Sequence, residues 1–176
     1  SITNSGNGAI NITGNSNAGA GTRLMLLRSV NNTQNGFINI TGSSQSNVGV
    51  VFAAAYVATP GWNMTVDNSG NGAINVVGTS SSNIGWYTGG GTFALFSGNI
   101  NMTVNSTNNG NVSFVGVSNT GYGLYTTDDT IILNSSGGGN ISVRGVTNST
   151  TRAGLVFDSY SGAPVTTLRS SGSGSI

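Results

Sequence analysis

The side chains that could perform acid–base or nucleophilic chemistry are few in this sequence. His, Glu, Lys and Cys are absent, and the four carboxylates are Asp67, Asp128, Asp129 and Asp158. General acid–base catalysis needs His, Glu, Lys or two Asp side chains at a suitable separation. The adjacent pair Asp128 and Asp129 is typical of a solvated turn, with weak cation binding as the alternative. The sequence therefore predicts a protein that is not an enzyme and that has no cofactor and no metal site.

Aromatic side chains are the second group that could contact a ligand, and they gather in and beside the two longest variable segments of the chain. The candidates are Tyr56, Trp62, Trp86, Tyr87, Phe93 and Phe96. Aromatic surfaces of this kind stack on sugars or anchor a partner protein. The alternative is that these rings cover small satellite cores beneath their own loops. Both readings, a contact surface for a protein or glycan and a purely structural role, stay open at this point.

The composition favours strands and turns. The chain has 176 residues, of which 29 are Gly, 25 Asn, 25 Ser and 21 Thr, and only two are Pro. Gly, Ser, Asn and Thr favour turns or compete with the helical backbone for hydrogen bonds, so we expect essentially no helix. Because 36% of the residues are hydrophobic, the chain has material for a core and does not have the composition of a disordered linker.

Charge and hydropathy exclude two classes of partner. Five Arg against four Asp give a net charge of +1, and no basic stripe is present that could hold a nucleic-acid backbone. No apolar run approaches the roughly 20 residues of a membrane span, so we expect no membrane insertion. The absence of Cys excludes disulfides but fits either a reducing compartment or an exported chain.

One octapeptide pattern recurs along the whole chain. It reads NGAINITG from Asn7, NGFINITG from Asn35, NGAINVVG from Asn71, NGNVSFVG from Asn109 and GGNISVRG from Gly138. Its second residue marks each copy, at Gly8, Gly36, Gly72, Gly110 and Gly139, and a sixth, incomplete copy has its marker at Gly174. The intervals between markers range from 28 to 38 residues. Internal repetition of this period is typical of a solenoid.

A fixed frame underlies these unequal intervals. An aliphatic residue stands six positions before every marker, as at Val66 and Val104, and a second glycine stands 13 after it in four of five repeats. In the fifth repeat that second glycine, Gly154, stands 15 after the marker. Nearly all the length variation lies between the second glycine and the next aliphatic residue. A constant frame with one variable loop per repeat is what stacked strands require.

Alternation within the frame predicts the strands and the core. Aliphatic and polar residues alternate after each marker, which gives a strand with one apolar face. The predicted core residues are Ile10, Ile12, Ile38, Ile40, Ile74, Val76, Val112, Phe114, Ile141 and Val143. The predicted corner glycines, where a positive φ or a close backbone approach is needed, are Gly8, Gly14, Gly36, Gly42, Gly72, Gly78, Gly110, Gly116, Gly139 and Gly145.

These elements predict an all-β fold of one domain, residues 1–176. Two further strands per repeat follow from the apolar stretch after the second glycine and from the aliphatic residue before each marker. We expect a right-handed parallel β-helix, or β-solenoid, of about five coils with three short strands and one variable loop each. Stacking should align Asn7, Asn35, Asn71 and Asn109 into an amide ladder. The uncapped ends predict an excerpt from a longer repeat protein or a unit that stacks end to end.

The pattern N-G-x-I-x-I-x-G, followed by Ser/Thr-rich residues and then by glycine, a hydrophobic residue and an aromatic one, resembles the repeat regions of filamentous-haemagglutinin-like exoproteins. These are the large adhesins of two-partner secretion systems, and the resemblance covers all five repeats. It implies a secreted protein at the bacterial cell surface with a role in adhesion or biofilm formation. The family's secretion domain and receptor-binding regions have no counterpart in this sequence.

Three functions remain as expectations. The first is the structural shaft of a cell-surface adhesin that contacts an unidentified protein or glycan of a host or neighbouring cell. The second is a self-assembling extracellular filament, in which the chain binds copies of itself through open β-helix ends or laterally. The third is a carbohydrate-binding or carbohydrate-active β-helix, and catalysis in that case would need carboxylates that this sequence does not contain.

Overall fold

The computed structural model describes residues 1–25, 27–53, 62–83, 85–89, 100–127, 130–158 and 166–176. In these ranges it contains strands and no helix, which confirms the predicted all-β composition. The strands are β1 (Ile2–Asn4), β2 (Ile10–Ser16), β3 (Thr22–Met25), β4 (Ser29–Asn32), β5 (Ile38–Ser44), β6 (Val50–Ala53), β7 (Trp62–Asn68), β8 (Ile74–Ser80), β9 (Trp86–Gly89), β10 (Ile100–Ser106), β11 (Val112–Ser118), β12 (Leu124–Thr127), β13 (Thr130–Ser135), β14 (Ile141–Thr147), β15 (Leu155–Asp158) and β16 (Thr166–Ser170).

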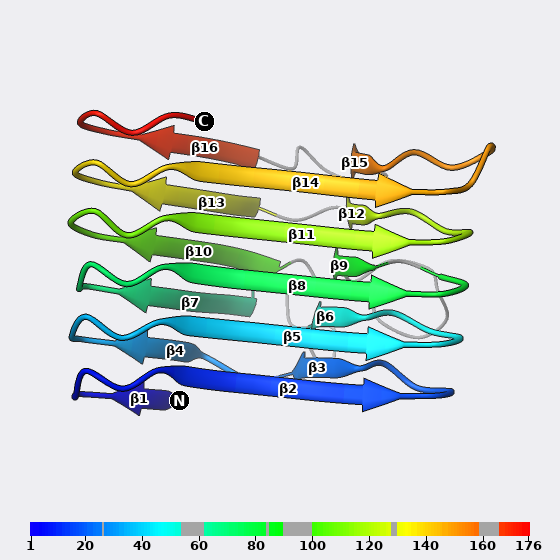
Figure 1. The fold of residues 1–176 in the computed structure, drawn as a ribbon, viewed down its shortest axis with the longest axis horizontal. Coiled ribbons are helices and arrows are strands. Elements are labelled where there is room, and N and C mark those ends of the chain that lie inside the picture. Colours follow the sequence, from blue (N-terminus) through cyan, green and yellow to red (C-terminus); the bar gives the residue numbers. More distant parts are fainter. Residues whose placement is uncertain (26, 54–61, 84, 90–99, 128–129, 159–165) are drawn as a thin grey trace.

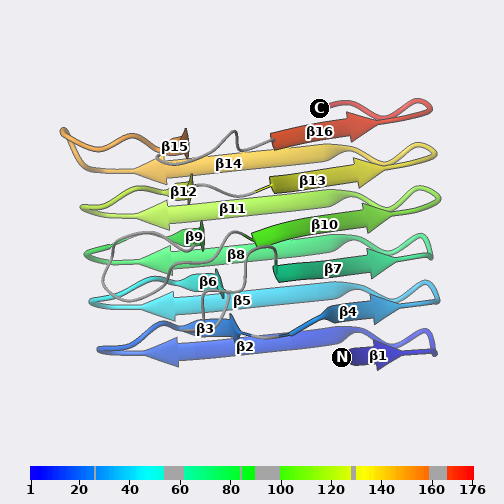
Figure 2. The ribbon, with the colours of Figure 1, turned by 180° about the vertical axis from the view of Figure 1, so that it is seen from behind.

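Every third strand belongs to the same parallel sheet (Figure 1). Sheet A has the order β1-β4-β7-β10-β13-β16, sheet B has β2-β5-β8-β11-β14, and sheet C has β3-β6-β9-β12-β15. One repeat therefore passes once through sheets A, B and C, and the next repeat stacks on it. Seen from behind, the strands of sheets A and C lie in front of the long strands of sheet B (Figure 2).

The strands pair in the register that the repeat predicts. Ile10 pairs with Ile38 and Ile38 with Ile74 in sheet B. In sheet A, Val66 pairs with Val104, as expected for the aliphatic residues that precede the markers. The two extra residues of the fifth repeat lie between Thr147 of β14 and Leu155 of β15, so they leave the pairing of β15 with β12 intact.

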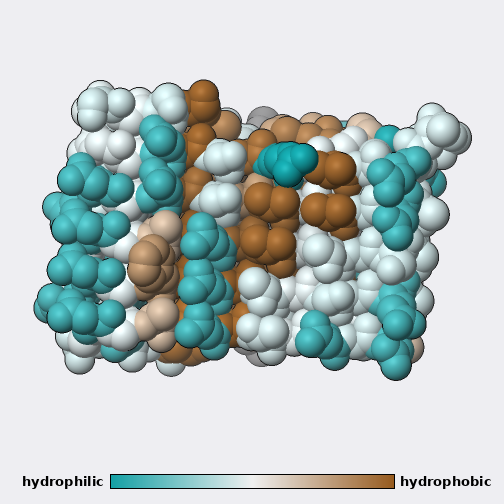
Figure 3. All heavy atoms as spheres, in the orientation of Figure 1, coloured by the Kyte–Doolittle hydropathy of each residue, from teal (hydrophilic) through white to brown (hydrophobic). Residues whose placement is uncertain are grey.

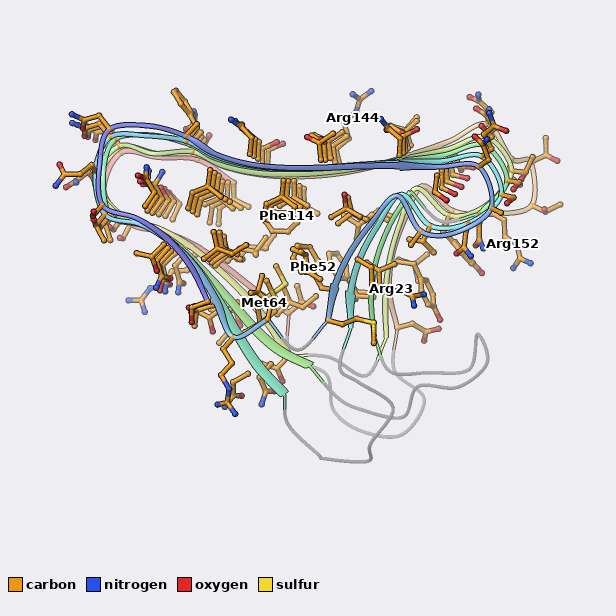
Figure 4. All side chains as sticks on the ribbon, turned by 90° about the horizontal axis from the view of Figure 1, so that it is seen from below. Arg23, Phe52, Met64, Phe114, Arg144 and Arg152 are labelled. Atoms are coloured by element: carbon orange, nitrogen blue, oxygen red, sulfur yellow. The ribbon has the colours of Figure 1, made fainter. Side chains whose placement is uncertain are left out.

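The core lies between the three sheets and receives one face of each. Of the predicted core residues, Ile12 and Val143 are partly buried, and the other eight are buried. Sheets A and C supply inward residues that the prediction did not name, among them Val30, Met64, Val66, Met102, Val104, Val50, Phe52, Leu124, Ile131 and Leu133. Figure 4 shows Phe52, Met64 and Phe114 inside the outline of the stack.

The last residue of each octapeptide, which is a glycine, does not lie at a corner. Gly14 and its equivalents are the fifth residues of the seven-residue strands of sheet B, so the prediction of a corner there is wrong. These glycines are needed because the backbone at the start of sheet C packs directly onto them. An added Cβ would lie 1.9–2.0 Å from a carbonyl oxygen in each of the pairs Gly14 and Gly21, Gly42 and Gly49, Gly78 and Gly85, Gly116 and Gly123, and Gly145 and Gly154.

The marker glycine of each octapeptide, Gly8 or its equivalent, does lie in the connection between sheets A and B. Close approach again explains the residue type, since a Cβ on Gly72 would lie 2.1 Å from the carbonyl oxygen of Gly36. Left-handed backbone is rare in the described ranges and occurs at Gly137, Gly172 and Asn108, with φ values of 82°, 93° and 59°. Most of these glycines therefore provide space, while their φ angles stay in the ordinary range.

A column of inward hydroxyls closes the corner between sheets B and C. Ser80 Oγ accepts a hydrogen bond of 2.9 Å from the backbone N–H of Asn83 in its own repeat. The same hydroxyl donates to the carbonyl oxygen of Asn47, the equivalent residue one repeat earlier, at 2.5 Å. The pattern recurs at Ser44, Ser118 and Thr147, each of which donates to the preceding repeat. Each hydroxyl thus accepts a hydrogen bond from a backbone N–H of its own turn and donates one to a carbonyl oxygen of the preceding turn.

A second polar column lies at the corner between sheets A and B. The side-chain amide of Asn68 donates to the carbonyl oxygens of Gly72 in its own repeat and Gly36 in the preceding one, at 2.5 and 3.0 Å. Asn32 occupies the same position one repeat earlier and also donates to Gly36. Ser135 takes this position in a later repeat and donates to Gly139 at 2.8 Å. Both ends of sheet B are therefore closed by buried hydrogen bonds between repeats.

Gly78→Ala tests the close packing of sheet B against sheet C. The new Cβ would meet the Gly85 carbonyl oxygen at 2.0 Å, so the two backbones must separate and the free energy of unfolding should fall by about 3 kcal/mol. The measurement is the midpoint of urea denaturation. Gly138→Ala is the control, because its Cβ would lie 3.0 Å or more from side-chain atoms that can move. Equal midpoints for the two variants would contradict the packing argument.

Ser80→Ala tests the buried hydroxyl column. The substitution leaves the Asn83 N–H and the Asn47 carbonyl without their side-chain partner, so stability should fall by about 2 kcal/mol in the same denaturation experiment. Ser82→Ala removes an exposed hydroxyl that donates to the Gln45 carbonyl at 2.9 Å, and it should cost less than about 0.5 kcal/mol. A loss at Ser82 as large as the loss at Ser80 would show that burial of the hydroxyl is not what matters.

Candidate binding surfaces

The predicted aromatic contact surface falls largely outside the described residues. Tyr56, Phe93 and Phe96 lie outside them altogether. The backbone of Trp62 belongs to β7, and that of Trp86 and Tyr87 to β9. Tyr87 pairs with Val51 on one side and Tyr125 on the other. A role for these six aromatic residues in binding therefore stays a prediction.

A different aromatic cluster lies on the outer side of sheet C. The rings of Tyr122 and Tyr125 stack with centroids 5.0 Å apart and an angle of 24° between their planes. The Arg152 guanidinium lies 5.1 Å from the Tyr122 ring centroid and donates to the Tyr122 hydroxyl at 3.0 Å. The Tyr125 hydroxyl donates to Asp158 Oδ2 at 3.3 Å. Because its polar groups pair with one another, this cluster joins β12 to the following repeat.

Outward-facing side chains of the same type form ladders along the stack. In sheet B, the Asn39 amide donates to Asn11 at 2.9 Å, and the Asn75 amide donates to Asn39 at 3.0 Å. At the corner predicted to carry an Asn ladder, Asn71 donates to Asn35 at 3.3 Å through its amide and at 3.1 Å through its backbone. Amides pair well in such ladders because each one both donates and accepts.

Sheet A carries an outward column that contains two opposite charges, three strands apart. In one outward column, Asp67, Asn105, Asn134 and Arg169 pair successively in register. The Asn105 amide donates to Asp67 Oδ1 at 2.7 Å, and the Asn134 amide donates to Asn105 Oδ1 at 2.9 Å. The part of the column from Asp67 onward therefore runs from a carboxylate through two oriented amides to a guanidinium, and Asn31 and Thr3 precede Asp67 in the same register.

A groove follows this column across four repeats. Its volume is about 520 Å³, and the residues that line it all have polar or charged side chains: Asp67, Asn68, Ser69, Asn105, Ser106, Thr107, Asn134, Ser135, Ser136, Arg169 and Ser171. A second row of hydroxyls, which includes Ser69 and Thr107, stands two residues beyond the charged column. The inward residues Asn68, Ser106 and Ser135 lie between the two rows, and their backbone forms the floor. No groove at this position was predicted from the sequence.

The outer face of sheet B is flat and changes character along the stack. Thr13 and Thr41 share a column with Val77, Val115 and the exposed Arg144. The Thr41 hydroxyl donates to Thr13 at 3.0 Å. In the later repeats the valines form an apolar patch, seen in brown near the centre of Figure 3. Because its columns change residue type, this face does not repeat one chemical motif.

The carboxylates lie apart where they can be placed. Asp67 belongs to β7 of sheet A and Asp158 to β15 of sheet C, while Asp128 and Asp129 fall outside the described residues. No group of three or more His, Cys, Asp or Glu side chains suited to a metal ion occurs within the described ranges. Nor does any described segment form an apolar helix long enough to span a bilayer.

Comparisons with known proteins identify no relative. No family model matches the chain, and neither the curated proteins nor the solved structures contain a match.

Asn105→Asp tests the directional ladder in the groove. The substitution replaces the amide that donates to Asp67 with a second carboxylate, so a hydrogen bond becomes a repulsion between like charges. Stability at neutral pH should fall by about 1–3 kcal/mol, measured by urea denaturation. In the control Asn101→Asp, the partner is Asn63, whose amide can turn and donate to the new carboxylate, so the loss should be below about 0.5 kcal/mol. Similar losses for both variants would contradict the ladder's directionality.

Proposed function

We propose that the chain is a right-handed parallel β-helix that forms the structural shaft of a secreted, cell-surface bacterial adhesin. The observation that carries this proposal is the in-register stacking of equivalent strands in three parallel sheets. A fold that adds one more layer with every repeat supplies length, and length is the property that a projecting shaft needs.

The path of the chain supports the right-handed form. Figure 4 views the stack from below, which is the β1 end in Figure 1. From that end the chain runs leftward along β1 and then rightward along β2 above it, and it recedes from the viewer with each later repeat. A clockwise path that moves away from the viewer is the sense of a right-handed coil. Right-handed connections between parallel strands are also the strong general preference.

The bonding between repeats supports a stiff rod. Each repeat is joined to the next by three strand ladders, by the buried columns at both ends of sheet B, and by amide pairs on the surface. Opening any layer would break several of these hydrogen bonds together, and each contributes roughly 1 kcal/mol. Such a rod should also resist proteases, because cleavage requires local opening of the backbone.

The variable segments between sheets C and A are the natural places for contact with a partner. They change length from repeat to repeat while the frame of the stack stays constant, as expected for loops that carry specificity on a rigid scaffold. A protein or glycan on a host or neighbouring cell is the expected partner. The resemblance of the repeat to adhesin shafts supports this assignment, as does the absence of His, Glu and Lys for catalysis.

The test is negative-stain electron microscopy of the full-length polypeptide that contains this chain, together with its mass on a denaturing gel. We expect a thin rod whose length is about 4.8 Å times the number of repeats in one polypeptide. An antibody raised against this chain should label the surface of intact cells. Long fibres built from short chains would contradict the shaft and favour a self-assembling filament, whereas a compact particle would contradict both.

A further inference from the structure

We propose that the groove on sheet A, lined by Asp67, Asn105, Asn134 and Arg169, binds an acidic oligosaccharide with a uronic acid at one end. This inference deepens the proposed function, because the bound glycan would be a contact that the shaft itself makes. It rests on the shape of the groove, on the chemistry of its two rows and on the order of charges along it.

The side chains in the groove are those that bind sugar hydroxyls. Carboxylates and amides present two polar atoms in one plane, which suits two neighbouring hydroxyl groups of a sugar ring. The Asp67 side chain accepts one hydrogen bond at Oδ1, from Asn105, and within the described chain the structure records none at Oδ2. The opposite row, with Ser69, Thr107 and Ser136, offers hydroxyls that both donate and accept. A ligand with many hydroxyls can pair with both rows.

The order of charges indicates which end of the ligand is acidic. Among the described residues, Arg169 is the only cation in the lining, it is exposed, and no hydrogen bond from its guanidinium is recorded. A guanidinium binds a carboxylate through two parallel hydrogen bonds, so a uronic acid fits at this end. Asp67 lies at the opposite end, where a neutral sugar with free hydroxyls fits and a second acid would be repelled.

The length of the groove indicates a short oligosaccharide. Asp67 and Arg169 are three strand spacings apart, which is about 14 Å at about 4.8 Å per strand. A sugar residue in an extended glycan has a length close to one strand spacing, so about three residues can follow the column. Successive residues would then meet equivalent side chains of successive repeats.

The same features disfavour other polymers. A nucleic acid or a heavily sulfated glycan carries an anion on every unit and needs several cations, whereas this groove has one cation and one carboxylate. Within the described part of the chain no aromatic residue belongs to the lining, so the directional contacts that the groove offers are hydrogen bonds and the two charges. The expected affinity is therefore modest and selective for one terminal acid.

The test is calorimetric titration of the chain with a panel of trisaccharides that end in glucuronic, galacturonic or mannuronic acid, beside the same sugars with their carboxyl groups reduced. At least one acidic trisaccharide should bind, and its reduced form should bind about tenfold more weakly or worse. Arg169→Gln should weaken the acidic ligand by the same factor and leave the reduced one unchanged. Thr107→Val should weaken both forms about fivefold, because it removes a lining hydroxyl while keeping the side-chain shape.

Two controls match these variants on another face of the molecule. Arg144→Gln removes an equal charge from the outer face of sheet B, and Thr41→Val places valine in a column that already contains Val77. Neither control should change the affinity. Equal weakening by Arg144→Gln and Arg169→Gln would overturn the proposal, and so would equal binding of the acidic and reduced sugars. Absence of binding by every member of the panel would also overturn it.

Failure of this inference and failure of the proposed function have different signatures. A polypeptide that forms a rod of the expected length but binds no trisaccharide in the panel would remove the glycan site and leave the shaft. A polypeptide that binds an acidic trisaccharide but forms compact particles would remove the shaft and leave the groove as a lectin-like site. The variants Arg169→Gln and Thr107→Val should not change the rod, because both side chains are exposed.

Discussion

The close approach of two columns of glycine is the constraint on which the rest of this structure depends. Sheet B lies so near the start of sheet C that a Cβ on Gly78 would meet the Gly85 carbonyl oxygen at 2.0 Å. This contact closes the narrow end of each repeat, and the inward hydroxyl of Ser80 then fills the remaining corner with hydrogen bonds to both turns. Since the same contact recurs in every repeat, the strands remain in register while the segments between sheets C and A vary in length. The packing thus separates a fixed scaffold from variable loops.

In-register stacking also explains the composition. Each outward side chain lies about one strand spacing, or 4.8 Å, from the equivalent side chain of the next repeat. Identical charges would repel at that distance, whereas an amide can donate to one neighbour and accept from the other. The pairs formed by Asn11, Asn39 and Asn75 follow this rule. A chain with 25 Asn and only nine charged residues is therefore what a tall parallel stack selects. The low charge is a consequence of the architecture.

Much of the scaffold could be predicted from the sequence. The alternation of aliphatic and polar residues after Gly8 and its equivalents predicts the strand, its register with the next repeat and the face that is buried. The role of Gly14 could not be predicted, since the sequence pattern is the same whether a glycine turns the chain or makes room for a neighbouring backbone. The groove left a signal that was overlooked. The residue after each predicted aliphatic anchor is Thr3, Asn31, Asp67, Asn105, Asn134 and Arg169 in turn, and aligning these positions would have revealed two opposite charges in one column. The predicted aromatic surface lies mainly in variable segments, where the repeat provides no register for inference.

The groove on sheet A is the place where the chain departs from its own rule of self-pairing. In columns such as Asn11, Asn39 and Asn75, each side-chain amide pairs with the same kind of amide in the next repeat. Little hydrogen-bonding capacity then remains for a ligand. Between Asp67 and Arg169, the amides of Asn105 and Asn134 both donate toward Asp67, and the groove has a carboxylate at one end and a guanidinium at the other. A ladder of identical amides would gain similar hydrogen bonds without placing a carboxylate and a guanidinium in the column. Shaft stability alone does not require these two charges, and their position over a polar groove is best explained by a ligand that carries hydroxyls and one acid.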